Sequence, residues 1–179
     1  MTIQASNNLS DILIVDDQED IRSLIEGILQ DEGYQTRSAA DSQSAEKMIA
    51  EKAPDLVVLD IWLENSELDG MQLLKKLVKS HPDMSVIMIS GHGNIETAVS
   101  AIQMGAYDFI EKPFQTDKLL VLTQRGVEAA RLKRENQELK LKALGSVSEL
   151  HGNSQAVHQL RQSIERVAPA NSRILITGE

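Results

Sequence analysis

Short, uninterrupted apolar runs are the feature that most constrains how this chain can fold. Residues 56–59 (LVVL) are apolar throughout, and residues 85–89 (SVIMI) are apolar after the first serine. A strand with two apolar faces must be covered on both, as in a parallel sheet between two layers of helices. Segments with apolar residues at helical spacing separate these runs. The first two thirds of the chain therefore predict an α/β fold.

Five strand–helix units follow one another in this part of the chain. The predicted strands are residues 11–15, 35–39, 56–59, 85–89 and 107–110. The predicted helices are residues 20–30, 42–51, 71–79 and 94–104, and a last helix starts near Thr116. In the fourth helix we expect an inward apolar face made by Ile95, Ala98, Val99 and Ile102.

The last helix is expected to continue past the edge of this fold. Its residues follow the a/d spacing of a short coiled coil at Ala129, Leu132, Asn136, Leu139 and Ala143. Because the pattern lasts barely two heptads, an ordinary amphipathic helix is the alternative. After a break at residues 145–146, residues 154–167 predict a helix and residues 174–177 (ILIT) a strand. The inward side chains of that helix are expected to be Val157, Leu160, Ile164 and Val167.

Composition and charge exclude several classes of function. The chain has no cysteine, which excludes disulfides, zinc–thiolate sites and thiol nucleophiles. Residues 1–120 carry 21 acidic and 9 basic side chains, and such an acidic domain repels nucleic acid and attracts cations. No apolar run approaches the length of a membrane span, and no signal-peptide pattern opens the chain. We therefore expect no membrane association and a cytoplasmic location.

Polar residues with related chemistry stand where the predicted strands end. Asp16 and Asp17 follow the first strand, Asp60 the third, and Ser90 the fourth, while the fifth leads to Lys112. Parallel sheets bind ligands at the carboxyl ends of their strands, so these side chains are expected to converge. Three carboxylates repel one another unless a cation joins them, and oxygen-only ligands suit Mg²⁺.

This set of side chains is suited to phosphoryl transfer. A bound Mg²⁺ would hold one phosphoryl oxygen, Lys112 would neutralise a second, and the Ser90 hydroxyl would donate to a third. Asp60, alone at the end of the central strand, is the predicted nucleophile. Taken singly, each residue has a plainer interpretation: a helix cap, a turn residue or a solvated surface lysine. Because all of these residues stand at the ends of predicted strands, we favour a phosphoryl-transfer site over the separate plainer interpretations.

Four segments of the chain resemble signatures of the response-regulator receiver family, in family order. They are DILIVDDQEDIR, VVLDIW, VIMISGHG and YDFIEKPF, and the resemblance covers residues 9–125. It implies a flavodoxin-like (CheY-like) doubly wound fold: a five-stranded parallel sheet in strand order 2-1-3-4-5, here with a C-terminal helical extension. It also implies the following roles: metal-binding acids Asp16 and Asp17, phosphoacceptor Asp60, metal-binding carbonyl of Trp62, switch residues Ser90 and Phe109, and the phosphate-binding Lys112.

A further resemblance is to the enhancer-binding regulators of the nitrogen-regulation (NtrC/NtrX) family, most of all the NtrX type. It implies a receiver at residues 1–125, a helical linker at 126–146, and at 147–179 the beginning of an AAA+ ATPase domain. The phosphate loop G-E-x-x-x-G-K of that domain would begin at Gly178, and the sequence stops at Glu179. We therefore expect no ATP hydrolysis. The expected partners are a sensor histidine kinase and a second copy of the chain, with sigma-54 RNA polymerase and DNA contacted only by domains outside this sequence.

One loop departs from the pattern of most receivers. Leu63-Glu64 replaces the usual Met-Pro after the acceptor strand, and the loop at residues 64–69 is acidic and two residues longer, so that its closing glycine is Gly70.

Two rival functions would use some of the same residues. A phosphatase of the haloacid-dehalogenase type needs Asp-x-Asp after the first strand, whereas this chain has Asp-Asp-Gln. A receiver that is never phosphorylated would not need the complete set of acids, hydroxyl and lysine.

Overall fold

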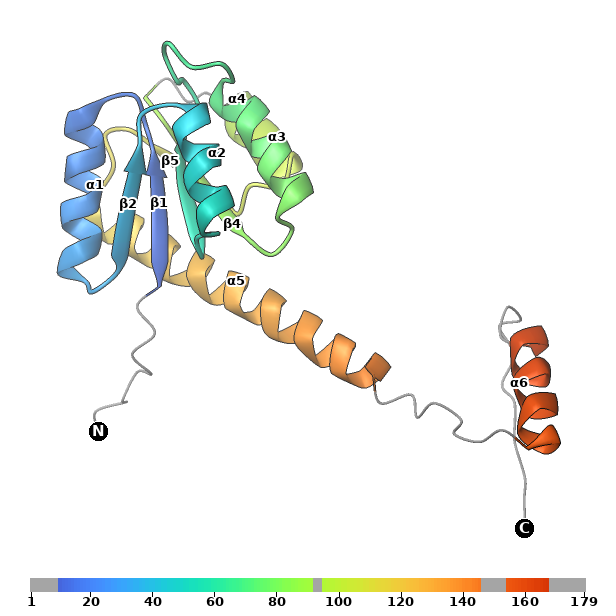
Figure 1. Ribbon diagram of the computed structural model, residues 1–179. Helices are drawn as coiled ribbons and strands as arrows, with labels where there is room; N and C mark the ends of the chain where they lie inside the picture. Colours follow the sequence, from blue (N-terminus) through green and yellow to red (C-terminus); the bar gives the residue numbers. More distant parts are fainter. Residues whose placement is uncertain (1–9, 92–94, 146–153, 168–179) are drawn as a thin grey trace, which may run out of the picture. The chain divides into compact units, whose positions relative to one another are not determined.

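The structure is a computed structural model that describes residues 10–91, 95–145 and 154–167 (Figure 1). Strands and helices alternate along the chain. Their bounds are β1 (Asp11–Val15), α1 (Glu19–Asp31), β2 (Gln35–Ala39), α2 (Ser42–Glu51), β3 (Leu56–Asp60), α3 (Gly70–Ser80), β4 (Ser85–Ser90), α4 (Ile95–Gln103), β5 (Asp108–Glu111), α5 (Thr116–Gly145) and α6 (Gln155–Val167).

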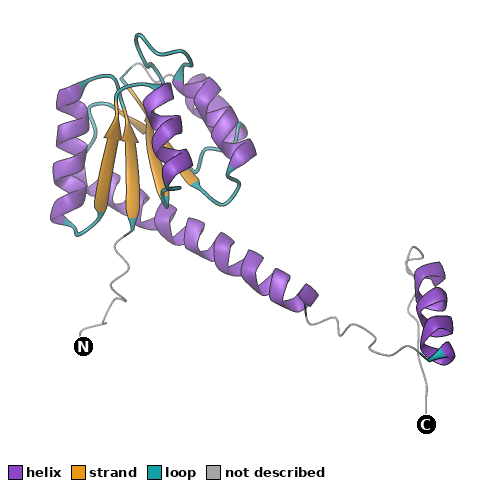
Figure 2. Cartoon of the chain, viewed as in Figure 1, coloured by secondary structure: helices purple, strands orange, loops and turns teal. Residues whose placement is uncertain are grey.

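The five strands form one parallel sheet in the order β2-β1-β3-β4-β5, as the resemblance implied. β3 is the central strand, and it pairs with β1 on one side and β4 on the other. The strands point the same way, so their carboxyl ends share one edge of the sheet (Figure 2). The last residue of β3, Asp60, therefore lies in the middle of that edge.

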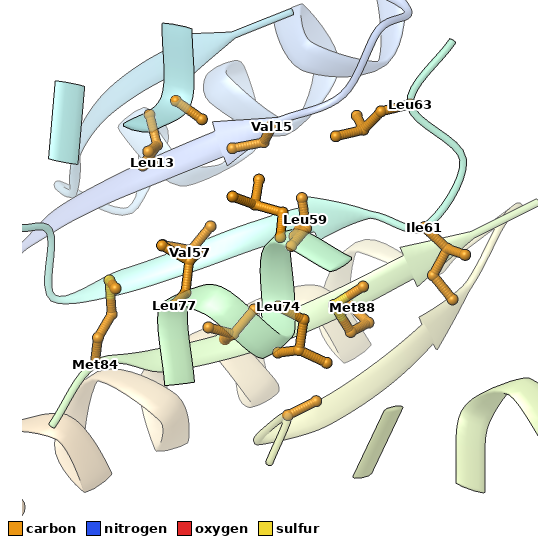
Figure 3. Close-up of a cluster of buried hydrophobic side chains, with 14 of the residues drawn as sticks. Leu13, Val15, Val57, Leu59, Ile61, Leu63, Leu74, Leu77, Met84 and Met88 are labelled. Carbon is orange, nitrogen blue, oxygen red and sulfur yellow. The ribbon is translucent and has the colours of Figure 1, made fainter. Parts of the chain in front are cut away.

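Alternate side chains of the strands supply two separate cores. On one face, Leu13 and Val15 of β1 pack with buried residues of α2 and α3, and Figure 3 shows this cluster around Val57, Leu59 and Met88. On the other face, Ile12 and Ile14 pack with side chains of α1 and α5. Burial on both faces explains why β1 and β3 have no exposed residue.

Two glycines follow the ends of helices. Gly33 follows α1 with φ of 87°, and Gly105 follows α4 with φ of 105°. Both values lie in the left-handed region, where a glycine has no Cβ to clash. At Gly105 a Cβ would also lie 2.9 Å from Cγ1 of Val78, so the turn into β5 packs closely against α3.

The orientation predicted for α4 is wrong. Ile95 is 83% exposed, and Val99 and Ile102 are also exposed, whereas Ala101 is fully buried. The short side chain of Ala101 permits a close approach of α4 to the sheet, and the helix rotates its larger apolar residues toward solvent. Apolar periodicity could not reveal this, because the pattern at helical spacing is the same whichever face is covered.

α5 stays attached to the sheet beyond the edge predicted from sequence. Ala130 is fully buried, and Arg134, one turn later, forms an ion pair with Asp55 at the start of β3. The compact unit that contains the sheet accordingly runs to Asn136. After Ala130, the described residues of α5 are solvent-exposed, including Leu132 and Leu139 of the heptad pattern.

The second unit, residues 137–179, is described only for the end of α5 and for α6. Val157 and Leu160 of α6 are half-buried and Ile164 is exposed, so its predicted inward face has little cover among the described residues. The strand expected at 174–177 lies outside the described residues. Within the described part of the chain, no helix combines the length and apolar character needed to cross a membrane.

Replacing a helical glycine by alanine should have opposite effects on the stability of the fold at Gly27 and at Gly126. A Cβ at Gly27 in α1 would meet nothing within 4 Å, so Gly27→Ala should stabilise the fold by about 0.5–1 kcal/mol through helix propensity. A Cβ at Gly126 in α5 would lie 2.5 Å from Cδ1 of the buried Leu56, so overpacking should outweigh propensity and destabilise by about 1–2 kcal/mol. Urea unfolding of both variants measures this, and equal effects would contradict it.

Candidate functional site

Three carboxylates meet at the carboxyl edge of the sheet. Asp16 and Asp17 directly follow β1, and Asp60 ends the neighbouring strand β3. One carboxylate oxygen of each lies within 4.8 Å of the others, close enough to hold one metal ion. Asp16 and Asp60 are 2% and 4% exposed, so this charge is concentrated where little water screens it.

Lys112 brings positive charge to this group. Its Nζ donates to Oδ2 of Asp16 at 2.6 Å and to Oδ2 of Asp60 at 2.8 Å. The backbone N–H of Lys112 donates to the carbonyl of Ser90 at 2.8 Å, which continues the pairing of β5 with β4. The Lys112–Pro113 peptide bond is cis. The lysine is thus fixed at both its backbone and its ammonium group.

Burial and ion pairing shift the pKa values of Asp60 and Lys112 in opposite directions. Burial raises the pKa of the Asp60 carboxyl above its ordinary value, with Lys112 opposing the rise and Asp16 adding to it. Burial by itself would lower the pKa of Lys112, but the hydrogen bonds and attraction of Asp16 and Asp60 outweigh it and raise that pKa. A nearby cation would therefore relieve the cost of the buried carboxylates.

One atom of the site points to such a cation. Oδ1 of Asp17 is buried and has no hydrogen-bond partner among the described residues. An unpaired buried carboxylate oxygen costs free energy, and a bound ion would satisfy it. The donor set consists of oxygens alone, which fits a hard divalent cation. An open cavity of about 400 Å³ gives access to the site, and Asp17, Asp60, Lys112, Trp62, Glu64 and Gly91 contribute to its lining.

The remaining predicted site residues lie around this cavity or behind it. The backbone N–H of Trp62 donates to Oδ1 of Asp60 at 3.4 Å, and the Trp62 residue is 57% exposed. Ser90 is fully buried as the last residue of β4. Phe109 is half-buried on β5, against the core cluster on the α2 and α3 face. Ser90 and Phe109 therefore lie on the neighbouring strands that lead from the site toward α4.

The structure adds residues that sequence reasoning missed. Arg22 of α1 donates through Nη1 to the carbonyls of Asp16 at 2.7 Å and Asp17 at 3.1 Å, which fixes the turn that carries both acids. Glu64 also lines the cavity. Asp16 and Asp17 do not serve as the N-cap of α1. The N-cap residue is Gln18, and it makes no side-chain cap hydrogen bond. No sequence signal marked Arg22, because its acceptors are backbone atoms.

The β3–α3 loop returns to the acceptor strand at Gly70. The Gly70 N–H donates to the carbonyl of Ile61 at 2.9 Å. A Cβ at this position would lie 1.9 Å from the carbonyl oxygen of Asp60 and 2.7 Å from Cα of Ile61. Both are backbone atoms that cannot move without displacing the end of β3. Glycine is therefore required here, ten residues after Asp60 in this longer loop.

Fold and site together define a domain of the receiver type: a five-stranded parallel sheet with an acid triad and a lysine at its carboxyl edge. Residues 12–124 match the family model described as the response regulator receiver domain. The chain therefore belongs to the response regulator receiver family, and within that family to the NtrX receivers.

Similar proteins support this assignment. The nitrogen assimilation regulatory protein NtrX of Azorhizobium caulinodans is 55% identical over 168 residues, which are 94% of this chain and 37% of that protein. The crystal structure of the receiver domain of NtrX from Brucella abortus is 60% identical, with a TM-score of 0.64, and the match covers 66% of this chain and 98% of that one. The beryllofluoride-activated NtrC4 receiver domain dimer is 39% identical, with a TM-score of 0.63, and the match covers 67% of this chain and 98% of that one.

The chain spans about a third of the length of the curated relatives it matches, such as 37% of the Azorhizobium protein. More distant relatives include DctD, a C4-dicarboxylate transport transcriptional regulatory protein of Pseudomonas aeruginosa, 36% identical over 172 residues, with 94% of this chain and 37% of that protein covered.

Gly70→Ala and Gly91→Ala test how closely the loop packs on the acceptor strand. Gly70→Ala should destabilise the fold by about 3 kcal/mol or more, because strain in a backbone contact cannot be relieved by a side-chain rotation. Gly91→Ala is the matched control in the same site, since its Cβ would meet only Cδ of Lys112 at 4.0 Å. Urea unfolding compares the two. A Gly70→Ala variant as stable as the control would contradict the close approach.

Proposed function

We propose that this chain accepts a phosphoryl group on Asp60 and acts as the receiver of a two-component response regulator. The observation that carries the proposal is the contact of Lys112 Nζ with both Asp16 and Asp60, at 2.6 and 2.8 Å, beside the unpaired oxygen of Asp17. Asp60 is the nucleophile, because it is the acid that ends the central strand and lines the open cavity. Catalysis by this domain is limited to gain and loss of its own aspartyl phosphate.

The cofactor of this reaction is Mg²⁺. Asp17, Asp60 and the Trp62 carbonyl would hold it directly, and Asp16 would hold one of its waters. The ion supplies positive charge to a phosphoryl oxygen and to the carboxylates. Lys112 neutralises a second phosphoryl oxygen, and the Ser90 hydroxyl donates to a third. The Asp16–Lys112 contact keeps the ammonium group beside Asp60 before the phosphoryl group arrives.

Phosphorylation would draw Ser90 toward the phosphoryl group and let Phe109 turn further inward. Phe109 lies on β5, which packs against α4, and Ser90 lies on the neighbouring β4, so the change would reach the surface of α4, β5 and α5. A phosphoryl group shifts such a two-state balance only by its different interaction energy with the two states. The phosphoryl donor is a sensor histidine kinase, and the setting is the cytoplasm.

We propose residues 1–125 as the receiver, 126–146 as a helical linker whose first part stays packed on the receiver through Ala130 and Arg134, and 147–179 as the beginning of an AAA+ ATPase domain. Crystal structures of NtrX from Brucella abortus in complex with ATP and ADP, each 57% identical over 92% of this chain, motivate the last assignment. Contacts with sigma-54 RNA polymerase and DNA belong to further domains of the regulator, because the receiver itself is acidic.

Asp60→Asn tests the phosphoacceptor. The native chain, incubated with acetyl phosphate and Mg²⁺, should gain the mass of one phosphoryl group, and Asp60→Asn should gain none, because an amide is not a nucleophile at this site. Intact-mass spectrometry measures both. Asp31→Asn, the same change at the exposed far end of α1, is the control and should be phosphorylated like the native chain. Chelation of Mg²⁺ should abolish the gain. Phosphorylation of Asp60→Asn at the native rate would refute the assignment.

Self-association is proposed through exposed apolar side chains. α4 exposes Ile95, Val99 and Ile102, and α5 exposes Val121 on the same unit. Exposed apolar side chains that gather into a contiguous patch mark interaction surfaces. The second surface is the heptad face of α5, with Leu132 and Leu139 exposed and Asn136 at an a position. The solved NtrC4 receiver is described as a dimer.

Two charge substitutions separate the two surfaces. If α4 forms the dimer, Val99→Glu should raise the dimer dissociation constant at least tenfold, because a buried unpaired carboxylate is costly. If the α5 face forms it, Leu139→Glu should do so instead. Sedimentation of the native chain and both variants, with and without acetyl phosphate, measures this. A native chain that stays monomeric at high micromolar concentration in both conditions would contradict self-association.

A further inference from the structure

The long β3–α3 loop is fastened to the start of α2. The Ser66 hydroxyl oxygen accepts a hydrogen bond from the Ser42 N–H at 2.9 Å, and it donates to Oγ of Ser42 at 2.9 Å. Oγ of Ser42 also accepts from the Leu68 N–H at 3.2 Å. Just outside this group, Nε2 of Gln43 donates to Oε2 of Glu67 at 2.8 Å. We call the hydrogen-bonded group of Ser42, Ser66 and Leu68 the serine latch.

The serine latch satisfies groups that otherwise have no partner in secondary structure. Ser42 is the first residue of α2, so its N–H is one of the helix donors that no intrahelical carbonyl can reach. The capping side chain of Asp41 is engaged by the N–H of Ser44, at 2.8 Å. Ser66 therefore acts as a second cap from another part of the chain. Ser42 is 1% exposed, so its hydroxyl would be costly to leave unpaired.

The other end of this loop is the phosphoacceptor site. Ile61 is fixed by its N–H to the Ile89 carbonyl at 3.0 Å and by its own carbonyl to Gly70. Leu63 is buried in the core, and Asn65 turns the chain with φ of 54°. Trp62 and Glu64, which line the cavity, alternate with these anchors. The path of the backbone from Trp62 onward is thus set by Leu63 and then by the latch.

We propose that Ser66 is a positioning residue for the metal site: the serine latch holds the β3–α3 loop in the path that aims the Trp62 carbonyl at the ion. This inference rests on the proposed function. Ser66 touches no reacting atom and acts only through the loop. The latch joins the loop to α2 by three hydrogen bonds, which restrict the paths that the loop backbone can take. Its loss should weaken Mg²⁺ binding more than it weakens the fold.

The test compares Ser66→Ala with a matched control. Ser44→Ala removes a hydroxyl from the same first turn of α2, where it donates to the Asp41 carbonyl and does not touch the loop. Trp62 is the single tryptophan of the chain, so its fluorescence reports on Mg²⁺ titrations of the full chain. Ser66→Ala should raise the Mg²⁺ dissociation constant by roughly three- to tenfold, at or below the lower end of the effect of losing an outer-shell partner. Ser66→Thr, which keeps the hydroxyl, should restore binding.

Two further measurements separate positioning from general destabilisation. Without metal, the Leu68 amide should exchange its hydrogen faster in Ser66→Ala than in Ser44→Ala. With acetyl phosphate, the slower phosphorylation of Ser66→Ala should return to the native rate at saturating Mg²⁺. A native chain that responds to Mg²⁺ alongside a Ser66→Ala variant of unchanged affinity would overturn the latch and leave the proposed function standing. A native chain without any Mg²⁺ response would contradict the proposed function itself.

Discussion

The contact of one ammonium group with two buried carboxylates organises this receiver. Lys112 lies within 2.8 Å of both Asp16 and Asp60, although the three residues come from different ends of the sequence. Removing one partner of a buried charge pair leaves an uncompensated charge, which costs several kcal/mol. These contacts tie the end of β5 to the ends of β1 and β3. The clustered carboxylates at the edge of the sheet repel one another, and a bound cation would reduce this repulsion.

At the carboxyl edge of the sheet, the strand ends and the β1–α1 turn are firmly held, whereas α4 is held by fewer large side chains. The acids are fixed by strand ends, by Arg22 on the carbonyls of the β1–α1 turn, and by the return of Gly70 to the backbone of β3. On the opposite side of the site, α4 meets the sheet through the small Ala101 and exposes its larger apolar residues. A helix held by so few large contacts is a suitable element for a change of position. The proposed route from Ser90 and Phe109 leads to that helix.

Much of this was predictable from the sequence because it depends on local patterns. Apolar runs predicted β1, β3 and β4, a weaker pattern predicted β2 and β5, and the residues after the strands predicted the acids and the lysine that the structure brings together. The orientation of α4 was predicted wrongly, because the apolar stripe that contains Ile95 lies on a different face of the helix from Ala101, and only the neighbours of the helix decide which face is covered. Arg22 and Ser66 escaped notice because they bind backbone groups, which no residue pattern displays.

The sequence by itself determined the alternation of strands and helices and the residue type at each strand end. The alternation follows from the hydrophobic period, which is set within a few residues. Only the tertiary structure decided that α5 remains bound as far as Arg134, that α4 turns its apolar residues outward, and that Ser66 caps α2. Each of these contacts joins segments distant in sequence, and their partners are chosen by the packing of the whole domain.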